Sequence, residues 1–349
     1  MKQTTLIYLL LIAASTLAAN PRPLGDSRIV APFGFPGYPE GIAVHEGRIY
    51  VSGPAAFGVP SNFEPSKIFV YSQEHHNLVD TIVIKNQNTP LKAISCITFD
   101  ENDNLYVLDE GQGVLKINIK TKTQSVYAAP FYPVFQSAFN PPAPVLLNDL
   151  AFDKNGYLYI TDSFQATIWR VAPGGGAPTP WFTSAAIDGP FGPNGIRIDA
   201  KSQNVYFAQT FNAQGAGFIY TLPIKDHPVA TDLKIFHTFE AGAGPDGFAF
   251  GKSGKMYVAL AGASKIAVLA PNGAEITRYS GPANGPNNTS IVWANPANIA
   301  FDNSEETLLV TNHASLTGLP DPSPLFIIFD VFVNDKAGKL FEEFEKDDK

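Results

Sequence analysis

The sequence predicts an all-β fold, a six-bladed β-propeller, and two observations support this prediction. Six segments share one form, in which a special residue precedes a short run of alternating apolar residues. These segments begin at Glu40, Ser95, Asn148, Asn194, Asp246 and Ala297, which gives gaps of 55, 53, 46, 52 and 51 residues. The mature chain also shows no long helical period. A unit of about fifty residues with three or four strands, repeated six times, is typical of a six-bladed propeller.

Each segment is followed by a turn and a second strand pattern. The second patterns read "GRIYVSG", "NLYVLDE", "GYLYITDS", "NVYFAQT", "KMYVALAG" and "TLLVTNH", and third patterns such as "ATIWRVA" follow most of them. Alternation with β-branched and aromatic residues predicts strands, and the Asn155-Gly156 and Ser253-Gly254 pairs predict tight turns. A β-sandwich would not show six equal units, and a β-helix has a shorter period. Residues 20–349 therefore form one predicted domain. Either a strand near Ile29 to Phe33 or one at Phe326 to Val333 closes it.

The composition and the first residues indicate an exported protein. Lys2, the apolar run from Leu6 to Ala14 and the small residues up to Ala19 predict a signal peptide over residues 1–19. We therefore expect a secreted protein, or a periplasmic one in a bacterium. Two overlapping glycosylation sequons span residues 287–290. Cys96 is the single cysteine, so no intrachain disulfide forms. The net charge of -8 argues against a nucleic-acid partner. We expect a monomer that binds a small molecule, with no membrane partner after signal cleavage.

The first residues of the six segments are expected to form a ring, because the inner strands of a propeller meet at one mouth. Four of them carry carboxylate or amide oxygens: Glu40, Asn148, Asn194 and Asp246. A charge at the start of a buried strand is costly unless it is compensated. Hard cations prefer such an oxygen set. One divalent cation is therefore expected, Ca²⁺ first and Mg²⁺, Mn²⁺ or Zn²⁺ as alternatives. The competing interpretation is that these are ordinary turn and cap residues.

The motifs "PEGIAV", "LNDLAFDKNGYLYITDS", "GPNGIRID" and "GPDGFAFGKSGKMYVA" resemble those of the senescence marker protein, gluconolactonase and luciferin-regenerating enzyme family. Phosphotriesterases similar to diisopropyl fluorophosphatase share its site plan. The resemblance covers nearly the whole mature chain from Pro39 onward. It implies a six-bladed propeller whose divalent metal is held by Glu40, Asn148, Asn194 and Asp246.

One departure from the family concerns the substrate. Sugar-lactone members carry an Arg two residues before the Asn of the third repeat, where this chain has Leu146. The resemblance therefore implies a substrate more apolar than a sugar lactone. The Pro- and Phe-rich stretch from Ala128 to Leu147 is either a lid or a packed loop. Similarity to the phosphotriesterases implies that His313 lies near the pocket. Asp149, beside Asn148, is a further candidate substrate contact, although a turn or ladder role is the default.

These patterns predict a secreted metal-dependent hydrolase of a lactone or another ester. The cation would act as a Lewis acid, and Asp246 is the candidate general base, or the nucleophile in a phosphotriester reaction. Alternatives are a phosphotriesterase-like hydrolase and a non-catalytic binding propeller with a structural ion. A condensing propeller similar to strictosidine synthase is not expected to carry this metal set. The chain has no Gly-x-Ser-x-Gly nucleophile motif, and "APGGGAPTP" lacks the Lys of a phosphate loop.

Overall fold

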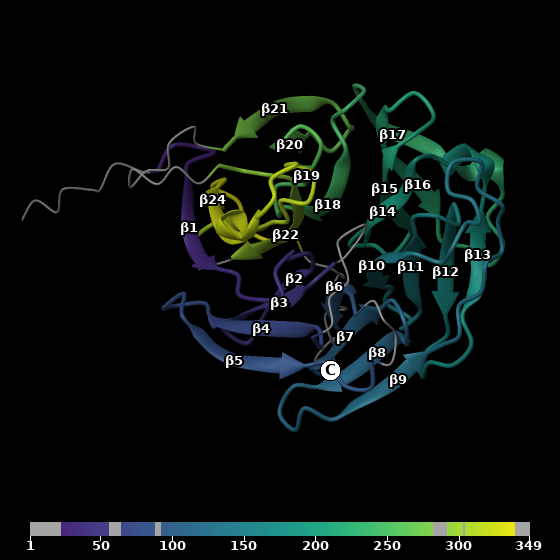
Figure 1. Cartoon of the computed structure of the whole chain (residues 1–349). Coiled ribbons are helices and arrows are strands. Elements are labelled where there is room, and N and C mark those ends of the chain that lie inside the picture. The colour runs from purple at the N-terminus through teal and green to yellow at the C-terminus, as the bar shows by residue number, and fades with distance from the viewer. Residues whose placement is uncertain (1–21, 56–63, 88–91, 282–291, 303, 339–349) are drawn as a thin grey trace, which may run out of the picture.

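The computed structural model describes residues 22–55, 64–87, 92–281, 292–302 and 304–338, so the predicted signal peptide and the sequons lie outside the described residues. The described residues form six four-stranded antiparallel sheets around one axis (Figure 1). The predicted all-β six-bladed propeller is confirmed. The helices in this part of the chain are short 3₁₀ turns: η1 (Ala185–Ile187), η2 (Ala230–Asp232) and η3 (Ser323–Leu325). No helix among these residues is long and apolar enough to span a membrane.

In each blade the four strands follow one another outward from the axis (Figure 1). The inner strands are β2 (Ile42–His45), β6 (Ile94–Phe99), β10 (Leu147–Phe152), β14 (Phe191–Ile198), β18 (Pro245–Phe250) and β22 (Pro296–Asp302). The second strands are β3 (Arg48–Gly53), β7 (Asn104–Asp109), β11 (Leu158–Asp162), β15 (Asn204–Phe211), β19 (Met256–Leu260) and β23 (Thr307–Asn312). The third strands are β4 (Lys67–Ser72), β8 (Gly113–Asn118), β12 (Thr167–Val171), β16 (Gly217–Pro223), β20 (Lys265–Leu269) and β24 (Ile327–Phe332). The outer strands are β5 (Leu78–Val83), β9 (Gln124–Ala128), β13 (Thr179–Thr183), β17 (Lys234–Phe239), β21 (Glu275–Ser280) and β1 (Ser27–Pro32).

The ring closes in the sixth blade, which contains both the first and the last strand of the described chain. Its strand order is β22, β23, β24 and then β1, so both strands that the sequence offered for closure are used. β24 is the third strand, and the N-terminal β1 pairs with it antiparallel as the fourth. Outside the ladder, Arg22 binds Asp330 of β24 through two hydrogen bonds of 2.7 and 3.0 Å. The first and last segments of the propeller therefore stabilise each other.

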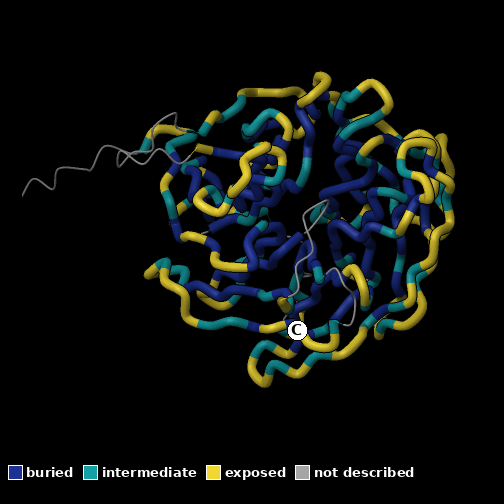
Figure 2. The backbone as a smooth tube through the Cα atoms, viewed as in Figure 1, coloured by how far each residue is buried: buried dark blue, intermediate teal, exposed yellow. Residues whose placement is uncertain are grey.

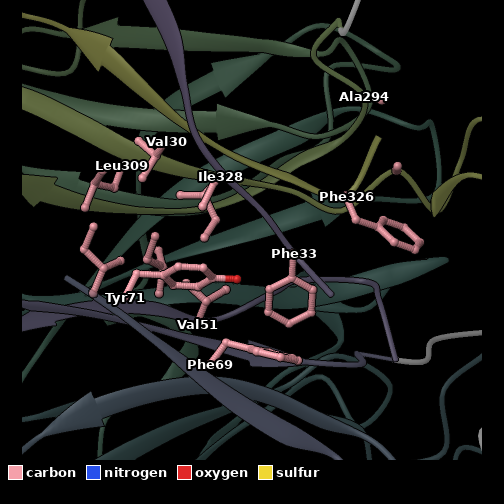
Figure 3. Packing of buried hydrophobic residues seen from close by; sticks show 13 residues of the cluster. Val30, Phe33, Val51, Phe69, Tyr71, Ala294, Leu309, Phe326 and Ile328 are labelled. Carbon is pink, nitrogen blue, oxygen red and sulfur yellow. The ribbon is translucent and has the colours of Figure 1, made fainter. Parts of the chain in front are cut away.

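The hydrophobic core consists of six clusters, one between each pair of neighbouring blades. The burial pattern shows this arrangement, since the interior of the ring is buried and the periphery exposed (Figure 2). The cluster between the sixth and first blades spans the closure, where Ile328 and Leu309 pack against Val51 and Tyr71 (Figure 3). Phe33 of the connecting segment meets Phe69 at a ring distance of 4.8 Å. Burial of these faces supplies the main stabilising term, because each sheet alone would leave both faces in water.

Five of the six inner strands carry a register irregularity at the segment starts that the sequence singled out. In β10, Leu147 pairs with Asp162 and Leu150 with Ile160, so Asn148 and Asp149 occupy a bulge. The same shift occurs in β6, β14, β18 and β22. A bulge bends the strand and re-aims its side chains. The sequence predicted the ring positions but not the bulges that orient them.

Hydroxyl groups on second strands tie these positions to the neighbouring blade. Thr161 Oγ1 accepts from the Asp149 N–H at 3.0 Å and donates to the Asn194 carbonyl at 2.6 Å. Ser52 and Thr311 make the equivalent bonds to the carbonyls of Ser95 and Glu40. The backbone carbonyls of Glu40, Ser95 and Asn194 are thus satisfied within the propeller.

Candidate functional site

The four predicted ligand residues occupy equivalent places around the axis. Asn148, Asn194 and Asp246 lie in the bulges of β10, β14 and β18, and Glu40 lies two residues before the start of β2. Neighbouring inner strands contact one another around the complete ring. The other two positions offer less, since Ala297 has no polar side chain and the Ser95 hydroxyl donates to the Leu147 carbonyl at 3.0 Å. The candidate site therefore has four oxygen-bearing side chains.

Three of these side chains have a buried oxygen without a partner. Asn148 Oδ1, Asn194 Oδ1 and Asp246 Oδ1 accept no hydrogen bond from the described residues. The Asn194 amide nitrogen, in contrast, donates to Thr210 Oγ1 at 2.9 Å, which turns its oxygen away from that hydroxyl. An unpaired buried acceptor costs about 1–3 kcal/mol. A cation coordinated by these oxygens would remove that cost, so the residues present fit the predicted divalent ion.

The carboxylates of the site affect one another's protonation. Burial, followed by the negative charges of Asp246 and Asp149, raises the pKa of Glu40 well above its usual range. Burial, followed by the charge of Asp149, raises the pKa of Asp246 in the same direction, while the Asn194 amide and the Gly247 N–H oppose the shift. Concentrated negative charge in a buried site favours a positive ion at its centre. The raised pKa values of Glu40 and Asp246 therefore point to the same cation site as the unpaired oxygens.

Asp149 has a different environment from its neighbour Asn148. Its Oδ1 accepts from the Leu150 N–H at 2.8 Å, and its Oδ2 accepts from the Ile196 N–H at 3.1 Å and from Arg197 at 2.6 Å. Arg197 also donates to Asn298 Oδ1 at 3.0 Å. Asp149 belongs to the third blade and Asn298 to the sixth, which face each other across a ring of six. The Arg197 guanidinium thus spans the axis, and a contact between Asp149 and substrate stays a prediction.

His313 lies beside Glu40. Its Nε2 is 3.7 Å from Glu40 Oε2 and 3.0 Å from the Ala55 carbonyl, and its Nδ1 is 2.7 Å from Ser315 Oγ. Burial lowers the pKa of His313 to about 4, so the ring is neutral at pH 7. With the proton on Nε2, the histidine donates to Ala55 and accepts from Ser315. The structure therefore joins His313 to the predicted ligand set, and its contact with substrate stays a prediction.

His313 belongs to a set of residues at the mouth whose other members were missed by sequence reasoning. Glu110, Ser163, Ala261 and His313 each follow the second strand of their blade, and each donates its N–H to the carbonyl two residues before the ring position. Burial of the carboxyl group, and then the charge of Asp109, raises the pKa of Glu110 to about 7, although the residue keeps exposed surface. The signal in the sequence was the constant offset from the second strand pattern, as in "VLDE", "ITDS" and "VTNH".

The stretch from Ala128 to Leu147 is a packed loop held at several points. Gln165 Oε1 accepts from the N–H groups of Val134 and Phe135 at 2.6 and 2.8 Å. Ser137 donates to Asp188 at 2.6 Å. Gln165 is fully buried, so its bonds to the loop are partly shielded from water. Of the two predicted alternatives, the structure favours a fixed wall beside Asn148.

The same wall is anchored to its blade by Asp162. The Asp162 carboxylate accepts from the N–H of Leu146 at 2.9 Å and from Trp169 Nε1 at 3.1 Å. Burial raises the pKa of Asp162 to about 6, against the effect of these hydrogen bonds. Asp162 therefore positions the backbone that leads into Asn148.

A comparison with protein families matches residues 72–311 to the model described as "SMP-30/Gluconolactonase/LRE-like region". The matched region is more than half of the chain. A comparison with curated proteins found no match.

Solved structures of the same fold are similar to the chain at low sequence identity. A calcium-binding protein, regucalcin, from Agrobacterium tumefaciens is 16% identical with a TM-score of 0.63, over 90% of this chain and 95% of its own. A gluconolactonase from Xanthomonas campestris is 14% identical with a TM-score of 0.59, over 88% and 89%. A luciferin-regenerating enzyme is 13% identical with a TM-score of 0.62, over 90% and 97%. At this identity the structural similarity supports the fold alone.

Proposed function

The chain belongs to the SMP-30/gluconolactonase/LRE-like family, and on that premise we propose that it is a secreted, divalent-metal-dependent hydrolase. Its substrate would be a lactone or another ester more apolar than a sugar lactone. The family includes lactonases, and the regucalcin relative is a calcium-binding protein. We further propose that the mature chain is an exported monomer whose partner is a small molecule.

The observation that carries this proposal is the set of unpaired buried oxygens on Asn148, Asn194 and Asp246. Glu40 adds a second carboxylate, so the four residues offer two charged and two neutral oxygen ligands. Ca²⁺ accepts such a mixed set, and Mg²⁺ and Mn²⁺ use the same donor types. Because Arg197 pairs with Asp149, the charges left on Glu40 and Asp246 would balance one divalent cation.

The bound cation would polarise the ester carbonyl oxygen as a Lewis acid. Asp246 would act as general base, because its Oδ1 has no competing donor among the described residues. It would take a proton from water as the water oxygen bonds to the carbonyl carbon. The carbon–oxygen bond to the leaving group then breaks, and the leaving oxygen takes up a proton. Asn148 and Asn194 would orient the substrate through the same ion, while Glu40 would be a structural ligand.

The apolar preference is supported by Leu146, which stands where sugar-lactone members carry an Arg. Leu146 is buried, and its backbone is fixed by Asp162. A leucine cannot donate hydrogen bonds to sugar hydroxyls. A polyol substrate would therefore lose interactions at this point.

The test is metal content and esterase activity of the purified mature protein beside Asp246→Asn. We expect one divalent ion per chain, and activity that a chelator abolishes while the circular dichroism spectrum stays native. Asp246→Asn is expected to lower kcat by roughly 100- to 10,000-fold, the usual contribution of a general base. Asp226→Asn is the matched control, because the Asp226 side chain is 86% exposed. Full turnover in Asp246→Asn would refute the assignment.

The same unpaired oxygens would also suit a purely structural ion in a non-catalytic binding propeller. In that case the chelator would unfold the protein, and no ester would be turned over. A phosphotriesterase-like hydrolase is the other alternative, and it is supported by the position of His313 beside Glu40. Phosphotriester hydrolysis without ester hydrolysis would favour that enzyme.

A further inference from the structure

An apolar group of side chains from the third and fourth blades stands at the mouth. We call it the aromatic shelf, and it consists of Leu146, Phe164, Phe191 and Phe211. The rings of Phe164 and Phe191 meet edge to face, with centroids 5.7 Å apart and planes at 76°. Phe191 and Phe211 are opposite partners in the β14–β15 ladder. The three Phe side chains are half-buried, so each keeps accessible ring surface.

The shelf lies close to two of the predicted metal ligands. Leu146 precedes Asn148 by two residues and Phe191 precedes Asn194 by three, which an extended chain spans in about 7 and 10 Å. Phe164 comes from another blade but is tied to the same place. Its neighbour Ser163 donates through Oγ to the Pro193 carbonyl at 2.7 Å, and Pro193 directly precedes Asn194. A substituent on an ester held by Asn148 and Asn194 would reach these rings.

The shelf is held rigidly by buried polar groups behind it. Asp162 Oδ1 accepts from the N–H groups of Leu146 and Phe164, at 2.9 and 3.4 Å. The Ser163 carbonyl accepts from the Gly192 N–H at 3.0 Å, which connects the third blade to the strand that carries Phe191. Because the backbone is fixed, ordering the shelf costs little when a ligand binds. A preformed apolar surface beside a few polar groups is typical of a small-molecule site.

We propose that the aromatic shelf binds a flat apolar group of the substrate, so that the substrate class is aryl esters and aryl-substituted lactones. The inference rests on the hydrolase function proposed above. A third ring placed against an edge-to-face pair gains further aromatic contacts as well as burial. A polyol in the same position would lose the hydrogen bonds that its hydroxyls make with water. The shelf thus selects the substituent, while the ring of oxygens binds the reacting carbonyl group.

The test compares kcat/KM for phenyl acetate and methyl acetate in the metal-loaded protein and in Phe164→Ala. We expect Phe164→Ala to lower kcat/KM for phenyl acetate about tenfold relative to methyl acetate, the loss expected for part of one buried Phe side chain. Phe164→Tyr keeps the ring and is expected to retain the preference. Tyr157→Ala is the matched control, because Tyr157 is a half-buried aromatic residue at the opposite end of the same blade. Equal losses for both esters, or none, would overturn the proposal.

A binding measurement separates the shelf from the hydrolase function. Acetophenone is a phenyl ketone, one atom shorter than phenyl acetate, that cannot be hydrolysed, and 2-butanone is a ketone without an aromatic ring. By calorimetry we expect the protein to bind acetophenone at least about tenfold more tightly, and Phe164→Ala to lose this preference. If no ester is hydrolysed but the preference is present, the hydrolase proposal fails and the shelf stands. If acetophenone has no advantage, the shelf proposal fails whatever the activity.

Discussion

Buried polar atoms in this protein fall into two groups, those with partners and those without. Thr161 Oγ1 is fully engaged, because it joins the Asp149 N–H to the Asn194 carbonyl of the next blade. Thr307 Oγ1 is equally buried but has no partner among the described residues. The two threonines therefore differ in what their hydroxyl groups do, although both lie on second strands.

This difference predicts opposite effects of the same substitution. Thr161→Val is expected to lower the free energy of unfolding by about 2 kcal/mol, because it leaves a buried N–H and a buried carbonyl unpaired. Thr307→Val keeps the shape and removes a hydroxyl that has no partner, so it is expected to be neutral or slightly stabilising. Urea denaturation of both variants checks this. Equal losses of unfolding free energy in the two variants would contradict the difference between the two hydroxyl groups.

The same distinction separates Asp149 from Asp246, which look alike in the sequence because both stand at the start of an apolar run. The repeat spacing predicted which residues lie in the ring. It could not tell which of their oxygens are already used, since that depends on Arg197 of another blade and on a bulge in the pairing of β10 with β11. The partners of a buried carboxylate are a tertiary property.

At the scale of elements, four of the six turns between inner and second strands carry an aspartate at the same place, which the first blade fills with His45 and the fifth blade leaves without a side chain. Asp100 and Asp153 accept turn N–H groups and receive a tyrosine hydroxyl, from Tyr106 at 2.9 Å and from Tyr159 at 3.4 Å. In the fifth blade the equivalent residue is Gly251. In that blade, Asp335 of the C-terminal segment accepts the corresponding hydrogen bonds.

The substitute aspartate makes the same kind of bonds from outside the blade. Asp335 accepts from the Ser253 N–H at 3.2 Å and from the Tyr257 hydroxyl at 3.1 Å. A Cβ atom at Gly251 would lie 2.2 Å from Asp335 Oδ2. The glycine therefore leaves the space that the C-terminal carboxylate fills.

We expect Asp335→Ala to lower the free energy of unfolding by about 2 kcal/mol, because the Ser253 N–H and the Tyr257 hydroxyl lose their acceptor. Gly251→Asp alone is expected to destabilise the protein, since it meets the Asp335 carboxylate. Combined with Asp335→Ala, it supplies the missing acceptor and is expected to restore part of the loss. Thermal unfolding of the four proteins in a double-mutant cycle measures the coupling. If the losses of the two single variants simply add in the double variant, Asp335 does not replace the missing turn aspartate.

The sequence predicted the strands and turns of these elements well, because alternation and turn residues act locally. It could not predict that a residue some eighty positions away completes one turn. For the same reason it left the stretch from Ala128 to Leu147 open between a lid and a packed loop. The bonds that hold that stretch come from Gln165 and Asp188, on segments that meet it only in the folded protein.

For the whole molecule, stability depends on closure of the ring by β1. The strand pairs with β24 and places Val30 in the cluster between the sixth and first blades (Figure 3). Removing it would open one edge of the sixth sheet and expose that cluster. Both offered closing strands turned out to be needed, since a four-stranded last blade requires a third and a fourth strand.

A chain that begins at Phe33 is therefore expected to lose about 5 kcal/mol or more of unfolding free energy relative to one that begins at Asn20. The loss combines buried apolar side chains with the hydrogen bonds of the ladder. A synthetic peptide of residues 20–32 is expected to restore part of it when added in excess. Calorimetry of the two chains, with and without the peptide, provides the measurement. Identical melting temperatures would show that β1 is not required for closure.

The guanidinium of Arg197 extends from the fourth blade to Asn298 on the sixth, beneath the ring of oxygens. The position of this side chain limits how a molecule can enter and leave the site. With the axis occupied behind the reacting centre, a molecule that enters the mouth has to leave by the way it came. Under the proposed hydrolase function, an acid or alcohol product still in the mouth would exclude the next substrate, so we expect the product that leaves last to inhibit competitively.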